Sequence, residues 1–244
     1  MRSLGIAFFV VVVGLAQLLR VPHKVEQLVK GLGRAGELKA AEATLVKKEN
    51  FTPGEMMKTW QFYALWFMYA CGSGAGLMII FTAKKLGATV QVGTWFVVFL
   101  AIGNGGGRIL AGMLSDKLGR KLTLGAFLLF QAVLVLILSV AATKGSVLSN
   151  AAALTILAAL TGANYGSNLA LFPAFAKDYY GLKNFGVNYG LIFTSWGVGG
   201  FMLAKLAGWV YDGALVAEWK GSYNFAFYTS ATLLVLAAVV VYFM

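Results

Sequence analysis

Residues 92–121 read VGTWFVVFLAIGNGGGRILAGMLSDKLGRK, and this stretch decides the fold. Sixteen uncharged residues precede Arg108, and a polar run that starts at Ser115 ends the apolar stretch. An apolar run of this length is typical of a helix that crosses a membrane. An arginine within such a helix costs about 2.5–3.5 kcal/mol on insertion scales, so Arg108 marks a functional position.

The composition extends this interpretation to the whole chain. Of its 244 residues, 59% are hydrophobic and only 12% are charged, against about 25% charged in an average soluble domain. The charged residues cluster and leave several long stretches nearly free of them, which predicts an all-α membrane protein surrounded by the lipid bilayer. The formal net charge is +11, but basic loops fix the orientation of membrane proteins. No nucleic-acid motif accompanies the charge, so we expect no nucleic-acid partner.

The reactive residues exclude most enzyme classes. Cys71 and His23 are the single cysteine and the single histidine of the chain. One of each leaves no disulfide and no zinc, haem or iron–sulfur site. No arrangement of a nucleophile and a base is visible either. We therefore expect no cofactor, no metal, no catalytic residue and no enzymatic activity.

The chain divides into three predicted regions. Residues 1–19 form a transmembrane helix; a signal peptide is the weaker alternative, since no small-residue cleavage site precedes Arg20. Residues 20–58 form a basic linker with eight Lys or Arg and five Glu, and Thr52 and Glu55 resemble a capping box that opens the next helix. Residues 59–244 form a six-helix bundle, giving seven spans in all. The six predicted spans of the bundle are 59–82, 92–114, 121–143, 148–175, 186–211 and 223–244.

Basic residues and glycines predict how these helices are oriented and packed. Thirteen Lys or Arg fall on the side of the 20–58 linker and four on the other side. The positive-inside rule then places 20–58, 115–121 and the C-terminus in the cytoplasm, with the protein multi-pass in the plasma membrane. Small residues let helix backbones approach closely. The glycines expected to do so are Gly72, Gly74, Gly76, Gly103, Gly105, Gly106, Gly107, Gly197, Gly199 and Gly200.

The pattern Gly112-Met-Leu-Ser-Asp116-Lys-Leu-Gly119-Arg120-Lys121 resembles the loop signature of the major facilitator superfamily. In that superfamily the signature joins the second and third helices of each six-helix half. The resemblance implies a bundle of two inverted three-helix repeats, alternating access, and a missing N-terminal half as partner, of which 1–19 would be the last helix. It implies a cytoplasmic conformational latch in which Asp116 either caps the following helix or pairs with Arg120. We expect Asp178 and Lys183 to be only topological.

Three further stretches resemble the oxalate/formate antiporter family and its monocarboxylate-transporter relatives. They are Asn104-Gly-Gly-Gly-Arg108, Asn164-Tyr-Gly-Ser-Asn168 with Phe172-Pro173, and Asn188-Tyr-Gly-Leu-Ile-Phe-Thr194. The resemblance implies secondary active transport of small organic anions, with Arg108 as the anion-binding charge. The oxalate-carrying branch has a lysine where this chain has Trp196. A single cation suits a monocarboxylate such as formate, lactate or pyruvate, with oxalate/formate exchange as the alternative.

Arg108 leads the candidate binding residues, because a guanidinium binds a carboxylate through two parallel hydrogen bonds. The alternative is that it reaches the cytoplasmic surface. Asn104 lies one turn earlier on the same face. Lys205 faces either the cavity or the outer headgroups. The remaining polar candidates recur in mid-span, and helix packing is the alternative for each: Tyr69, Tyr165, Asn168, Tyr189 and Trp196.

The sequence leaves the coupling and the assembly open. The predicted spans carry no Asp or Glu in mid-membrane. A proton as co-substrate would therefore need a carboxylate from the missing half, whereas anion exchange needs none. A half-transporter with a separately encoded partner, or a non-transporting membrane subunit, remains an alternative.

Overall fold

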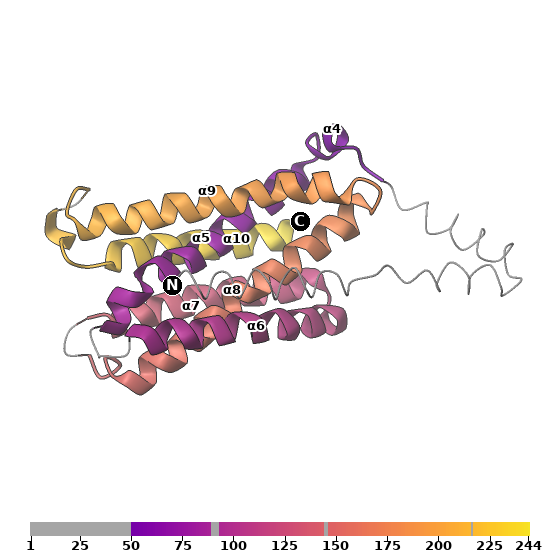
Figure 1. Cartoon of the computed structure of the whole chain (residues 1–244). Helices are drawn as coiled ribbons and strands as arrows, with labels where there is room; N and C mark the ends of the chain where they lie inside the picture. The colour runs from indigo at the N-terminus through magenta and orange to yellow at the C-terminus, as the bar shows by residue number, and fades with distance from the viewer. Residues whose placement is uncertain (1–49, 89–92, 144–145, 216) are drawn as a thin grey trace, which may run out of the picture. The chain divides into compact units, whose positions relative to one another are not determined.

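The computed structural model describes residues 50–88, 93–143, 146–215 and 217–244, which belong to one compact unit that begins at Asn50. The predicted span at 1–19 and most of the linker lie outside the described residues. Within them every regular element is helical, and Figure 1 shows long helices lying side by side. The elements are α4 (Pro53–Met56), α5 (Trp60–Ala88), α6 (Gly93–Leu118), α7 (Arg120–Ala141), α8 (Ala151–Tyr180), α9 (Phe185–Tyr211), η1 (Ala217–Trp219) and α10 (Asn224–Phe243).

Each of the six predicted bundle spans corresponds to one long helix. Five of these helices, α5, α6, α7, α9 and α10, contain segments long and apolar enough to cross a membrane. The sixth, α8, has 30 residues and buries polar side chains in its middle, among them Thr161, Asn164 and Asn168. Those polar residues lower its hydropathy without shortening it.

Helices α6 and α8 cross with their backbones in contact, through two Gly-x-x-x-Gly patterns. A methyl group at Gly103 or Gly107 of α6 would collide with the carbonyl oxygen of Ala159 or Ala163 on α8. The reverse holds for Gly162 and Gly166 of α8, which lie against the carbonyl oxygens of Leu100 and Asn104. Such small residues allow the close approach that dispersion contacts in a membrane require.

Helices α5 and α9 use the same device. Gly199 of α9 lies against the Ala70 carbonyl, and Gly74 of α5 lies against the Gly199 carbonyl. The third close pair is α7 with α10. These contacts repeat when α5, α6 and α7 are exchanged with α8, α9 and α10. The α6–α8 pair then becomes the α9–α5 pair, and the α7–α10 pair becomes itself. This is the pattern expected of two repeated three-helix units.

The prediction of close packing holds for some glycines and is wrong for others. A methyl group at Gly105, Gly106 or Gly197 would meet no described atom within 4 Å. These glycines lie on exposed faces of α6 and α9, so the bundle itself does not need them to be small. Sequence spacing alone does not separate the two kinds of glycine.

The predicted capping box is confirmed, but it opens a shorter helix than expected. The Thr52 backbone N–H donates to Glu55 Oε2 at 2.7 Å, and the Glu55 N–H donates to Thr52 Oγ1 at 3.4 Å. The Thr52 backbone N–H and the Thr52 hydroxyl group both donate to Glu55 Oε2, and these two bonds hold the pKa of Glu55 below its usual value. The helix they open is the four-residue α4, and the long helix α5 begins only at Trp60.

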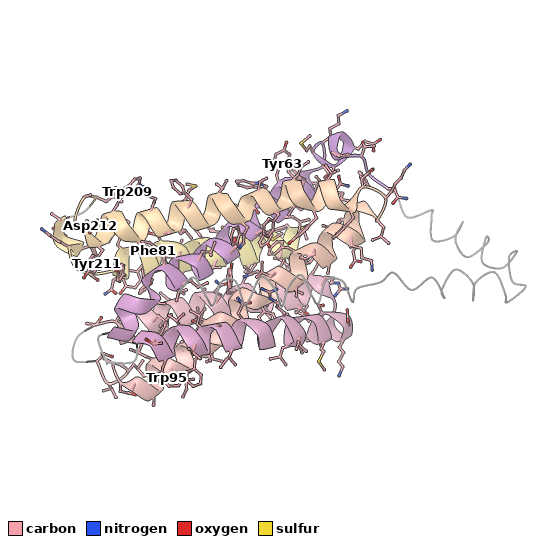
Figure 2. The ribbon with its side chains drawn as sticks, viewed as in Figure 1. Tyr63, Phe81, Trp95, Trp209, Tyr211 and Asp212 are labelled. Carbon is pink, nitrogen blue, oxygen red and sulfur yellow. The ribbon has the colours of Figure 1, made fainter. Side chains whose placement is uncertain are left out.

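Residues 50–52 bind the turn between α8 and α9. The Phe51 N–H donates to the Tyr180 carbonyl at 3.2 Å, and the Asn184 and Asn188 side-chain amides both donate to the Phe51 carbonyl at 3.0 Å. The α6–α7 turn lies at this same end of the bundle (Figure 1), which we call the latch end. Exposed aromatic side chains lie near both ends: Tyr63 near the latch end, Trp95 and Trp209 near the other (Figure 2). Aromatic side chains at two such levels are typical of membrane interfaces.

The packing predicts opposite effects for two adjacent substitutions. Gly107→Ala should lower the stability of the bundle by about 1–3 kcal/mol through overpacking against α8, or roughly 2–10 °C in Tm. Gly106→Ala should leave Tm unchanged or raise it slightly, because it adds a good helix former in open space. Thermal unfolding of the two purified variants in detergent measures the difference. Equal Tm values would contradict the backbone contact.

Candidate functional site

Arg108 lies in the middle of α6 without a carboxylate partner. Its side chain is exposed, and its Nε donates to Asn104 Oδ1 at 3.2 Å, one turn earlier on the helix. Among the described residues no Asp or Glu lies within ion-pair distance of it. The structure thus joins two of the predicted binding residues, and no acceptor among the described residues takes the remaining N–H groups of the guanidinium. Those groups are the ones that bind a carboxylate in the bidentate geometry.

Four of the other candidates form one aromatic cluster across three helices. The hydroxyl oxygens of Tyr69 on α5 and Tyr189 on α9 lie 3.3 Å apart. The Trp196 indole N–H on α9 donates to the Tyr165 hydroxyl on α8 at 2.8 Å. Each of these bonds links α9 to another helix, so the cluster ties α5, α8 and α9 together at one level.

Two phenylalanines complete the cluster. The Tyr69 ring stacks on Phe172 with centroids 4.1 Å apart, and the Trp196 ring stacks on Phe193 at 5.3 Å. Phe193 also contacts Tyr69 and Tyr189 edgewise or at an angle, at 5.9 and 5.6 Å. Neither phenylalanine was predicted as a site residue, because an apolar ring in an apolar helix carries no signal. Only the polar residues of the same sequence motifs indicated a site near these two phenylalanines.

The α6–α8 contact brings Arg108 to this cluster. Gly107 lies against Ala163, and Gly166 lies against Asn104, so Tyr165 is placed one position away from the contact. Asn104 Oδ1, which accepts the Arg108 Nε–H, lies 3.0 Å from the place of a Cβ atom at Gly166, the residue after Tyr165. A single cation and a group of neutral hydroxyl groups and aromatic rings therefore lie on helices in contact, an arrangement suited to a small anion with an apolar part.

Asn168 lies in a separate, buried polar group. Its amide donates to Gln131 Oε1 on α7 and to the Asn164 carbonyl, both at 3.4 Å. Gln131 in turn donates to the Gly72 carbonyl on α5 at 2.9 Å. Asn168 is only 1% exposed. The bonds of Asn168 and Gln131 together link α5, α7 and α8, and Gln131 was not predicted at all.

Lys205 lies apart from the aromatic cluster. Its Nζ is 5.9 Å from the Phe201 ring centre and 5.5 Å from the Trp209 ring centre, all on the exposed face of α9. Aromatic faces of this kind stabilise an ammonium group. Its charge is thus held on the outer surface of α9, toward the end that carries Trp209 (Figure 2).

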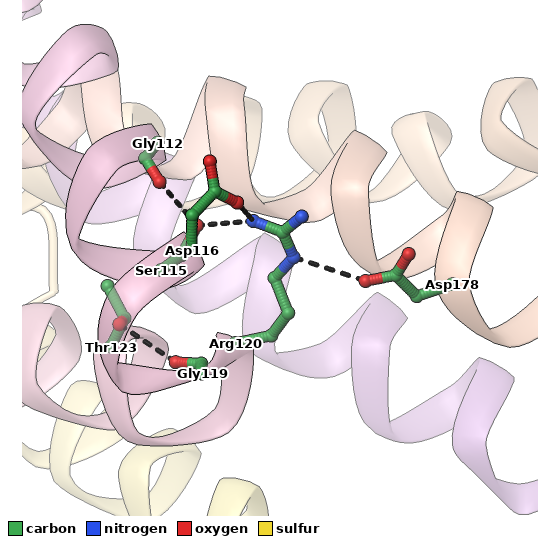
Figure 3. A network of polar contacts seen from close by, with 7 residues as sticks. All are labelled: Gly112, Ser115, Asp116, Gly119, Arg120, Thr123 and Asp178. Atoms are coloured by element: carbon green, nitrogen blue, oxygen red, sulfur yellow. Dashed lines mark hydrogen bonds and ion pairs between the residues drawn. The ribbon is translucent and has the colours of Figure 1, made fainter.

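The latch end holds a second arginine, and this one pairs with two carboxylates. Arg120 opens α7 after Gly119, whose φ of 88° lets a single residue reverse the chain between α6 and α7. Its Nη1 donates to Asp116 Oδ1 at 2.9 Å and to Ser115 Oγ, and its Nε donates to Asp178 Oδ2 at 3.1 Å (Figure 3). Of the two predicted roles for Asp116, pairing with Arg120 is therefore the observed one.

The prediction that Asp178 is only topological is wrong. Asp178 lies near the end of α8, 58 residues from Arg120. It is the more buried of the two carboxylates that bind Arg120, since its side chain is 35% exposed, against 69% for Asp116. Ser115 donates in turn to the Gly112 carbonyl at 2.9 Å. Lys121 is exposed and forms no ion pair with the described residues. These ion pairs and hydrogen bonds of Arg120 therefore join α6, α7 and α8.

Among the described residues, no group of three or more His, Cys, Asp or Glu side chains lies close enough to hold a metal ion.

Residues 61–244 match the family model of the Major Facilitator Superfamily. The chain belongs to the major facilitator superfamily. It is therefore a multi-pass membrane protein of a transporter family, with the all-helical fold that the superfamily shares.

Two relatives place the chain within this superfamily. It is 28% identical over 186 residues to the oxalate:formate antiporter of Oxalobacter formigenes, covering 75% of this chain and 41% of that protein. It is 27% identical over 163 residues to YhjX, an uncharacterized MFS-type transporter of Escherichia coli (strain K12), covering 63% of this chain and 38% of the relative. The chain thus spans about two fifths of the length of these relatives.

The exposure of the two carboxylates predicts unequal contributions to the latch. Asp116→Asn should cost less than about 0.5 kcal/mol of unfolding free energy, since exposed pairs contribute little. Asp178→Asn should cost about 1 kcal/mol, because its pair with Arg120 is better shielded from water. Thermal unfolding at low and high salt measures both, and a larger loss for Asp116→Asn would contradict the assignment.

Proposed function

We propose that this chain is the C-terminal half of a secondary active transporter that moves small organic anions by alternating access. The observation that carries the proposal is the uncompensated Arg108, held by Asn104 beside a cluster of neutral hydroxyl groups. A charge left unpaired on an apolar helix is costly. A bound carboxylate would remove that cost in each transport cycle.

Monocarboxylates such as formate, lactate or pyruvate suit the site best. Arg108 is the one cation that the described residues bring to the aromatic cluster, since Lys205 is held by Phe201 and Trp209. A second carboxylate would be desolvated without a counter-charge, which costs several kcal/mol. The similarity to the oxalate:formate antiporter favours oxalate/formate exchange as the second candidate.

The partner is an N-terminal half of the same superfamily. The chain covers about two fifths of its relatives, and α6 exposes apolar side chains over much of its surface, among them Ile102, Ile109 and Met113. Arg108 is exposed on the same helix, about a third of a turn from these side chains, so the other half would complete the anion site. A separately encoded half would make this chain a split transporter, and a non-transporting subunit would be inactive with any partner.

The latch would stabilise one conformation of this half at the cytoplasmic side. Arg120 joins the ends of α6, α7 and α8 through Asp116 and Asp178, with Gly112, Gly119 and Lys121 in the same turn. The basic-residue bias supports a plasma-membrane protein with 20–58, 115–121 and the C-terminus in the cytoplasm. Because the described carboxylates lie at helix ends or in turns, anion exchange needs nothing further from this half, whereas proton coupling would need a carboxylate from the other.

The central test is uptake by proteoliposomes that hold this chain with its N-terminal half. Labelled formate, lactate and oxalate are compared for the parent, Arg108→Gln and Arg108→Lys. Loss of a buried charge partner costs roughly 2–5 kcal/mol, so Arg108→Gln should lower formate uptake at least about thirtyfold. Arg108→Lys keeps the charge but loses the bidentate geometry, so its formate uptake should lie between that of the parent and that of Arg108→Gln.

Lys205→Gln is the matched control, because it removes another exposed cation of a long helix. It should transport formate like the parent. Arg108→Gln transport equal to the parent would refute the proposed function. Faster uptake of oxalate than of formate and lactate would favour the second candidate.

A further inference from the structure

Tyr165 lies where four helices meet. Its ring fills the space left by the missing side chain of Gly76 on α5, and the next residue, Gly166, packs against Asn104 on α6. Trp196 reaches it from α9. Tyr165 is only 5% exposed, so its hydroxyl group has few possible partners, and the direction of its hydrogen is set by its surroundings.

The bond from Trp196 leaves the hydrogen of the Tyr165 hydroxyl group to be donated to another group. An indole N–H is a donor only, so in the 2.8 Å bond the Tyr165 oxygen must be the acceptor. The hydroxyl hydrogen then points elsewhere, and no described residue accepts it. The Tyr69 and Tyr189 hydroxyl groups differ, because either of them can donate to the other.

Trp196 is itself held in place by stacking on Phe193, with an interplanar angle of 8°. A hydroxyl group that already accepts one hydrogen bond is polarised and becomes a stronger donor. Arg108 bonds Asn104, which packs against Gly166, the residue after Tyr165, so a carboxylate held by Arg108 would lie beside Tyr165.

We propose that Trp196 is a positioning residue that fixes the Tyr165 hydroxyl as a hydrogen-bond donor to the carboxylate held by Arg108. This inference rests on the proposed function and deepens it. The carboxylate receives two kinds of donor: the charged guanidinium from α6 and a neutral, oriented hydroxyl from α8. Trp196 touches Tyr165 and acts through it.

The test is a double-mutant cycle on formate uptake by the complete transporter in proteoliposomes. Tyr165→Phe removes the donor and should raise KM for formate about tenfold or more, as expected for a hydrogen bond to a charged group. Trp196→Phe keeps an aromatic ring on Phe193 but removes the N–H, and should raise KM by about three- to tenfold, with Vmax nearly unchanged. The double variant should match Tyr165→Phe, because Trp196 has no hydroxyl left to orient.

Trp66→Phe is the matched control. It also removes an indole N–H that is bonded to α9, in this case to Thr194 Oγ1 at 3.0 Å, and it should leave KM for formate unchanged. A structural role of the Trp196 ring would instead lower Vmax or the amount of folded protein. The inference would be overturned if the KM of the double variant rose by the product of the two single increases. An unchanged KM in Trp196→Phe would also overturn it.

Arg108→Gln in the same assay separates the two failures. If it transports formate like the parent, the proposed function fails and the positioning role fails with it. If it is inactive while Trp196→Phe and Tyr165→Phe both keep the parental KM, only the positioning role fails.

Discussion

A guanidinium group in the middle of an apolar helix needs compensation, and the described part of this bundle gives Arg108 only an amide oxygen. The Asn104 bond orients the side chain without neutralising it. The glycine contact between α6 and α8 then decides what lies beside it, because backbone contact at Gly107 and Gly166 leaves Tyr165 next to the charge. Bulkier residues at these positions would separate the arginine from the cluster. Close packing and the proposed anion binding are thus two consequences of the same crossing.

Helices α6 and α7 carry two arginines that illustrate opposite uses of one side chain. Arg120 lies at the latch end, donates to two carboxylates and a hydroxyl group, and joins three helices. Arg108 lies in mid-helix and has no carboxylate among the described residues. A paired arginine stabilises one arrangement of helix ends, whereas an unpaired one remains available to a ligand. The contrast supports a latch at one end and a binding site in the middle, and it arises from position alone.

The sequence predicted the helices well and their contacts only in part. Long apolar runs between charged turns fixed α5 to α10 to within a few residues, because hydropathy is a local property of the chain. Asp178 was missed as the partner of Arg120, since the two are 58 residues apart and nothing local joins them. Gln131 was missed for the same reason, since its partner Gly72 is 59 residues away, whereas Phe172 and Phe193 were missed because an apolar ring in an apolar helix carries no signal. Asn168 was predicted with the tyrosines, yet it bonds Gln131 in a separate group, because a motif shows which residues are polar and not which face they occupy.

Protection of Arg108 from an arginine-selective reagent tests the central claim most directly. Phenylglyoxal modification of the complete transporter, read residue by residue by mass spectrometry, is compared with and without saturating formate. Arg120 is the internal control, because its ion pairs do not depend on the anion. The account predicts that formate slows modification of Arg108 and leaves that of Arg120 unchanged. Equal modification of Arg108 with and without formate would contradict it.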